Sequence, residues 1–182
     1  MAHAETYLPK WQQFFKDTGI LPAHMDHNTA SDVEAALTVA RAGFDMTWVT
    51  AELTFCTPLH KRAIDAFGQT ETALGTALAN MMRIWNDEWF HFIPQFPDYP
   101  SPFPDDSVAC LHDPLTIASF FKGNWLTMRD HQLRFGIEGH LFRLHEVATD
   151  GEVTYPVSVD VDRAAFEQVF IDRVVQYLNS LK

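Results

Sequence analysis

A predicted helix between two predicted strands constrains this chain more than any other sequence feature. Ser31 is a good N-cap, Glu34 completes a capping box three residues later, and the run VEAALTVARAG ends on Gly43. Before it, residues 20–28 (ILPAHMDHN) are too short and too interrupted by proline for a helix and indicate an extended segment. After it, residues 45–53 (DMTWVTAEL) have the β-branched and aromatic side chains of a buried strand. This order predicts a βαβ unit with parallel strands.

The rest of the chain shows first helical and then strand periodicity. Apolar spacing predicts helices over residues 5–16, 58–67, 70–92 and 110–121. After Gly123 the period becomes two, which predicts three short strands with turns at Gly139 and Asp150-Gly151, followed by a helix over residues 163–181. We therefore predict an α/β fold with an open, mostly parallel, Rossmann-like sheet, a small antiparallel part and a C-terminal helix. Residues 1–182 are expected to form a single domain.

Charge and composition limit the partners of the chain. Thirteen Lys and Arg against 24 Asp and Glu give a net charge of −11 at pH 7, which repels nucleic acids and anionic membranes. The spacing of the two cysteines, Cys56 and Cys110, fits neither a disulfide framework nor a zinc ribbon. The sequence shows no signal segment and no apolar run long enough to span a membrane. We expect a soluble, cytoplasmic protein that binds neither nucleic acid nor membrane.

Two polar clusters stand where the chain enters predicted helices: HMDHNTASDVEAA at residues 24–36 and LHDP at residues 111–114. In an open α/β sheet, ligands bind beyond the carboxyl ends of the strands, where helix N-termini also point. Asp26, His112 and Asp113 are therefore candidate site residues. A purely structural role is also open: Asp26 can be a polar loop residue ahead of a helix cap, and His112 and Asp113 can be a first-turn pair in which the helix dipole favours the acid.

The same clusters resemble the sequence pattern of the nucleoside hydrolase family, of the inosine-uridine preferring type. The stretch DHNTASDVEAA at residues 26–36, followed by LTVARAG, is similar to the family's acidic residue, Phe, Asn and Asp-Pro-Glu-Ala-Ala run leading to Ala-Gly. The LHDP segment is similar to the family's His-Asp-Pro segment. The resemblance runs from about residue 19 onward and covers only the C-terminal half of the family's architecture, which implies a fold truncated at its N-terminus.

The resemblance implies roles for four residues. Asn28 matches the asparagine that binds ribose hydroxyls, and Asp26 stands where the family has a ribose-binding glutamate. His112 matches the histidine that protonates the departing base. Asp113 matches an aspartate that ligates the catalytic Ca²⁺, which makes Ca²⁺ the implied cofactor. The implied activity is hydrolysis of the N-glycosidic bond of ribonucleosides, which are small neutral substrates.

The sequence departs from the family pattern at the metal site. The family's Asp-rich motif, DTDPGxDDA, has no counterpart here, and Asp113 alone cannot supply the roughly six to eight oxygen ligands of Ca²⁺. We therefore expect hydrolysis to require an N-terminal half supplied by another polypeptide. Because a parallel sheet without its first strands exposes an apolar edge, we expect association with a second copy or with such a partner. The alternative is a catalytically inactive module that binds nucleoside or ribose, or a structural partner.

Overall fold

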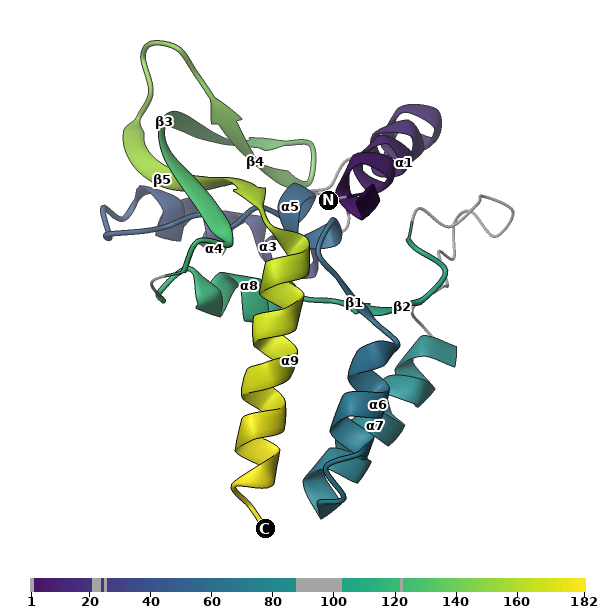
Figure 1. Cartoon of the computed structure of the whole chain (residues 1–182). Helices are drawn as coiled ribbons and strands as arrows, with labels where there is room; N and C mark the ends of the chain where they lie inside the picture. Colours follow the sequence, from purple (N-terminus) through teal and green to yellow (C-terminus); the bar gives the residue numbers. More distant parts are fainter. Residues whose placement is uncertain (1, 21–23, 25, 88–102, 122) are drawn as a thin grey trace.

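Helices and small antiparallel sheets make up the parts of the chain that a computed structural model describes, residues 2–20, 24, 26–87, 103–121 and 123–182 (Figure 1). The helices are α1 (Ala2–Thr18), α3 (His27–Ser31), α4 (Val33–Arg41), α5 (Ala51–Phe55), α6 (Arg62–Gly68), α7 (Ala73–Trp85), α8 (His112–Ala118) and α9 (Arg163–Asn179). The strands are β1 (Pro58–His60), β2 (Ser107–Cys110), β3 (Leu126–Glu138), β4 (Leu141–Glu146) and β5 (Val153–Val161). None of the described helices combines the length and apolar character needed to cross a membrane.

The larger sheet has the strand order β4-β3-β5, and both pairings are antiparallel. Gly139 joins β3 to β4 with a positive φ of 63°, a conformation that glycine adopts without strain. Helix α4 lies against one face of this sheet (Figure 1). The apolar cluster between them contains Ala40, Leu133, Phe135, Phe142, Tyr155 and Val157, all buried. The predicted antiparallel part is confirmed.

The predicted open parallel sheet is wrong for the described residues. The side chain of Asp26 caps α3, so the end of the predicted extended segment 20–28 is helical. In the predicted strand 45–53, only Trp48 forms a β-bridge, which is parallel and pairs it with Val157 of β5. Thr50 then precedes α5, which ends the extended conformation after that bridge. A βαβ unit requires two neighbouring parallel strands, and this part of the chain forms helices instead.

The helices predicted at both ends of the chain are confirmed by α1 and α9. Helix α4 is also confirmed, but its N-cap is Asp32, whose Oδ1 accepts a hydrogen bond from the backbone N–H of Ala35 at 2.9 Å. Ser31, the predicted cap, is the last residue of α3. Residues 21–23 and 25 of the predicted extended segment, and residues 88–92 of the predicted 70–92 helix, lie outside the described residues.

Strands β1 and β2 form the smaller sheet, which contributes residues to the second apolar core. Pro58 pairs with Cys110, and the N–H of Leu111 donates to the carbonyl of Thr57 at 2.9 Å. Because residues 58–60 are paired in this way, the helix predicted over 58–67 begins only at Arg62. Helices α6, α7, α8 and α9 contribute to the surrounding core, whose buried members include Leu59, Ile64, Ala79, Val108, Leu115 and Leu178.

A buried carboxylate joins β1 and α6 to α9. The side chain of Glu167 is 4% exposed and accepts hydrogen bonds from His60 N at 2.8 Å, His60 Nδ1 at 3.0 Å and Arg62 Nη2 at 2.6 Å. Burial by itself raises the pKa of Glu167, but the hydrogen bonds from His60 and Arg62 outweigh it and bring the pKa to about 2. The hydrogen bond to Glu167 raises the pKa of His60, against the lowering effect of burial. Glu167 is thus ionised and fully partnered in the folded protein.

Glu167→Gln is expected to lower the free energy of unfolding by about 3 kcal/mol at neutral pH, because it removes a buried charge from its partners. The pKa of Glu167 falls from 4.5 to about 2 on folding, so its contribution is complete above about pH 4.5 and is lost as the pH falls toward 2. The raised pKa of His60 acts in the opposite sense: its contribution is present below 6.5 and is lost as the pH rises through the folded value. Urea denaturation at about pH 7 and about pH 3 measures the free energy of unfolding of the variant and of the wild type.

Glu138→Gln is the matched control. Glu138 also contacts an arginine and a histidine, Arg143 at 3.5 Å and His145 at 2.7 Å, but its side chain is 59% exposed. Exposed ion pairs contribute little, so this variant should unfold close to wild type at either pH. Two results would contradict a stabilising role for ionised Glu167. One is an equal loss of unfolding free energy in the two glutamine variants, and the other is a loss in Glu167→Gln that is as large at about pH 3 as at about pH 7.

Candidate functional site

His112 is the first residue of α8 and lies beside the end of α5. Its Nδ1 is 2.7 Å from Oγ1 of Thr54, and its ring meets the ring of Phe55 nearly edge-on, with centroids 4.8 Å apart. The β1–β2 pairing explains this contact, because α5 ends just before β1 and α8 begins just after β2. Within the described residues, Nε2 of His112 has no hydrogen-bond partner, so this nitrogen is available to a ligand.

Asp26 performs a structural task at the start of α3. Its Oδ1 accepts from the backbone N–H groups of Asn28 at 3.2 Å and Thr29 at 3.4 Å, and its Oδ2 accepts from the Thr29 hydroxyl at 2.9 Å. An ionised carboxylate offers about four lone-pair sites, so these three bonds leave Oδ2 able to accept one more. Asp26 is thus itself a helix cap and not a loop residue ahead of one, and the capping role does not occupy the carboxylate completely.

Asn28 and Asp113 are exposed residues in the first turns of α3 and α8. Within the described part of the chain, the Asn28 side chain makes no hydrogen bond, which leaves its amide free to meet a ligand. Asp113 is the acid in the first turn of α8, whose N-cap, Leu111, supplies no side-chain cap. A carboxylate at this position stabilises the helix start, so Asp113 also has a structural role.

The carboxylates of Asp113 and Asp26 both influence the charge state of His112. Burial lowers the pKa of His112, and the Asp113 and Asp26 carboxylates oppose this effect. Asp26 acts on His112 from the N-cap of α3, and Asp113 acts on it from the next position of α8. Within the described residues, no hydrogen bond joins Asn28 to His112 or Asp113, so the structure links Asn28 to this group only through its neighbour Asp26.

Thr54 and Phe55 are site residues that our sequence reasoning did not identify. The available signal was their position directly after the apolar segment 45–53, because ligand-binding side chains often follow such segments. That signal does not distinguish them from core residues, and both are in fact buried, at 5% and 9% exposure.

The described residues do not fit the Ca²⁺ site that the family resemblance implies. Among them, no group of three or more His, Cys, Asp or Glu side chains is arranged to hold a metal ion. Asp113 offers one carboxylate, whereas Ca²⁺ takes roughly six to eight oxygen ligands. A complete site would need oxygen ligands from outside this part of the chain.

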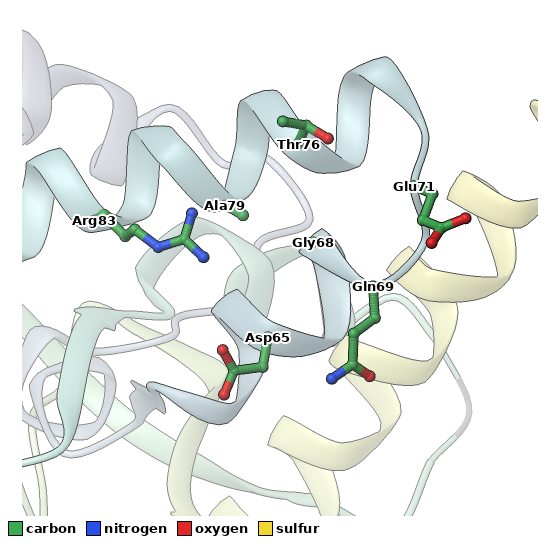
Figure 2. Close-up of a pocket in the computed structure, with 7 residues that line it drawn as sticks. All are labelled: Asp65, Gly68, Gln69, Glu71, Thr76, Ala79 and Arg83. Atoms are coloured by element: carbon green, nitrogen blue, oxygen red, sulfur yellow. The ribbon is translucent and has the colours of Figure 1, made fainter.

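A separate hollow of about 380 Å³ lies between α6 and α7 (Figure 2). Asp65 on α6 and Thr76 and Arg83 on α7 are among its lining residues, and most of the lining is exposed and of mixed charge. None of the four residues predicted for the site lines this hollow. We therefore take His112, with its contacts to Thr54 and Phe55, as the candidate site.

Comparison with known proteins finds a similar solved structure but no match by sequence. No protein-family model matches the sequence, and a search of curated proteins found no significant match. The structure is similar to a purine-preferring ribonucleoside hydrolase from Gardnerella vaginalis, with a TM-score of 0.63 and 20% sequence identity, covering 80% of this chain and 44% of that chain. The fold is nucleoside hydrolase-like. The chain spans less than half the length of that hydrolase.

Asp113→Asn is expected to lower the pKa of His112 further, because Asp113 is the first of the two carboxylates that oppose the effect of burial. NMR titration of the His112 ring resonances measures this pKa. Asp32→Asn is the control: Asp32 caps α4, asparagine caps helices equally well, and Asp32 does not act on His112. An unchanged or raised pKa in Asp113→Asn would show that the two side chains do not interact.

Proposed function

We propose that this chain binds the ribosyl group of a ribonucleoside at Asp26 and Asn28, with His112 as the proton donor to the departing base and Asp113 as one ligand toward a Ca²⁺ ion, and that it serves hydrolysis of the N-glycosidic bond. The observation that carries the proposal is the half-buried imidazole of His112, whose Nε2 is free within the described residues and on which two carboxylates act, in a nucleoside hydrolase-like fold. The structural neighbour is by name a hydrolase of purine ribonucleosides, so inosine is the natural first ligand to test.

These residue types suit the chemistry of this reaction. Breaking an N-glycosidic bond builds positive charge on the ribosyl ring, which a nearby carboxylate such as Asp26 stabilises. A departing base leaves more easily when it is protonated, and Nε2 of His112 is the free ring nitrogen for that transfer. The amide of Asn28 can both donate to and accept from ribose hydroxyls. A neutral nucleoside is also compatible with a chain of net charge −11.

Hydrolysis, in this proposal, depends on ligands from beyond the described residues. Asp113 is one carboxylate toward a Ca²⁺ site, and a second chain carrying acidic residues, or a second copy, would have to complete it. Nucleoside binding has no such requirement, because the proposed ribose contacts, Asp26 and Asn28, lie at the start of α3.

The second candidate function is a nucleoside-binding module without catalysis. It is favoured by one specific observation, the lack of a metal-ligand group among the described residues. The two candidates share the binding site and differ only in whether the glycosidic bond is cleaved.

Inosine binding, measured by isothermal titration calorimetry, is expected for the wild-type chain and should weaken about tenfold in Asn28→Ala, the loss of roughly one hydrogen bond to ribose. Asn80→Ala is the matched control, because Asn80 is also exposed and lies on α7, away from the site. If inosine does not bind, or if both alanine variants weaken binding equally, the proposed site is wrong.

Hydrolysis of inosine and of p-nitrophenyl riboside, by this chain alone and mixed with a protein that carries the DTDPGxDDA motif, each with and without Ca²⁺, separates the two candidates. Hydrolysis that is lost in both His112→Ala and Asp113→Ala supports the N-ribosyl hydrolase. Binding without hydrolysis under every condition supports the binding module. Hydrolysis that survives His112→Ala removes His112 from the catalytic role.

A further inference from the structure

The hydroxyl of Thr54 occupies a position from which it can control the His112 ring. Thr54 is buried in α5, and its Oγ1 lies 2.7 Å from Nδ1 of His112 and 3.3 Å from the carbonyl oxygen of Ala51. The ring of Phe55, the next residue, stands nearly perpendicular to the imidazole. The imidazole is thus held by a hydrogen bond at one nitrogen and by an aromatic contact at its side.

The hydroxyl has one proton to donate and two neighbours. The Ala51 carbonyl can only accept, so a hydroxyl proton given to it leaves Oγ1 as the acceptor for an N–H at Nδ1 of His112. In the opposite arrangement the hydroxyl donates to Nδ1, the Ala51 contact is lost, and the ring proton lies on Nε2. The hydrogen bond that one ring nitrogen of a histidine makes determines which of the two nitrogens carries the proton. The direction of the Thr54 hydroxyl therefore determines whether His112 is the Nδ1–H or the Nε2–H tautomer.

Proton transfer favours the first arrangement. A histidine that gives up a proton passes through the imidazolium form, in which both ring nitrogens are donors. A hydroxyl that donates to Ala51 accepts from Nδ1 in both the charged and the neutral ring, so it need not rotate between them. A hydroxyl that donates to Nδ1 would have to turn away each time the ring became protonated.

We propose that Thr54 is a positioning residue for His112: its hydroxyl, donating to the Ala51 carbonyl, keeps a proton on Nδ1 and so makes Nε2 the nitrogen that exchanges its proton with a ligand. The importance of this arrangement for catalysis rests on the proposed function. The tautomer itself is a property of the chain without any nucleoside, which allows the two to be tested separately.

Heteronuclear NMR of the ¹⁵N-labelled chain, recorded without ligand at about pH 8 where the ring is neutral, tests the proposal. His112→Asn identifies the His112 signals among those of the nine histidines. In the wild type, Nδ1 should show the shift of a protonated nitrogen and Nε2 that of an unprotonated one. Thr54→Val, which keeps the side-chain shape but removes the hydroxyl, should move the population toward the Nε2–H tautomer. Thr54→Ser should restore the wild-type pattern.

Phe55→Leu is the matched control. It removes the aromatic contact to His112 but keeps the Thr54 hydroxyl, so the tautomer should not change. A wild-type ring that carries its proton on Nε2 overturns the proposal, even if Thr54→Val fails to fold. A tautomer that is the same in wild type and folded Thr54→Val overturns it as well.

Kinetics provide a second measurement in any preparation that hydrolyses inosine. Thr54 does not contact the proposed ribose site, so Thr54→Val should lower kcat by about tenfold to a hundredfold with little change in KM, and Thr54→Ser should recover most of it. A rise in KM of similar size, with kcat unchanged, would contradict a positioning role. Failure of the chain to bind inosine would remove the proposed function and leave the tautomer result standing.

Discussion

The antiparallel pairing of β1 with β2 is the constraint on which the candidate site depends. These strands have only three and four residues, yet they connect segments that lie far apart in the sequence. Pro58 pairs with Cys110, and the bond from Leu111 N to the Thr57 carbonyl extends the pairing toward the site. The end of α5 and the start of α8 must then lie side by side, which brings Thr54 to His112. Glu167 secures the other end of the pair by accepting from the backbone N–H of His60.

The parts of the fold that local physical chemistry determines could be predicted. The period-two pattern after Gly123 and the turn at Gly139 gave the three antiparallel strands, and apolar spacing gave α4 and α9. The parallel sheet could not be predicted correctly, because β-branched and aromatic residues over 45–53 favour an extended backbone without specifying a neighbour. The neighbour is β5, and among the described residues its backbone forms a β-bridge with this segment at Trp48 and nowhere else. Pairing is a non-local property, so composition was a poor guide to it.

The site shows the same division. His112 and Asp113 could be located because a polar pair before an apolar run marks a helix start, and Asp26 because it precedes a capped segment. Thr54 could not be located, since its contact with His112 joins residues 58 apart in the chain. The structural interpretation made Asp26 a loop residue ahead of a helix cap, but Asp26 is itself the cap of α3, and three hydrogen bonds hold its carboxylate. Capping and ligand binding are compatible here, because the capping bonds fix where the remaining lone pair of the carboxylate lies.

The balance of forces at His112 separates two parts of the proposed chemistry. Burial disfavours the charged imidazole and lowers its pKa, and the carboxylates of Asp113 and Asp26 restore part of the lost stability of the cation. The net direction of the His112 pKa is still downward, so the neutral imidazole is favoured and the proposed donor must take up a proton before it can transfer one. In the proposed function, activation of water by a metal ion would require several oxygen ligands, and Asp113 brings one carboxylate. Ribose binding and protonation of the base, as proposed, therefore rely on residues of this chain, whereas a nucleophile generated by Ca²⁺ would rely on groups contributed from elsewhere.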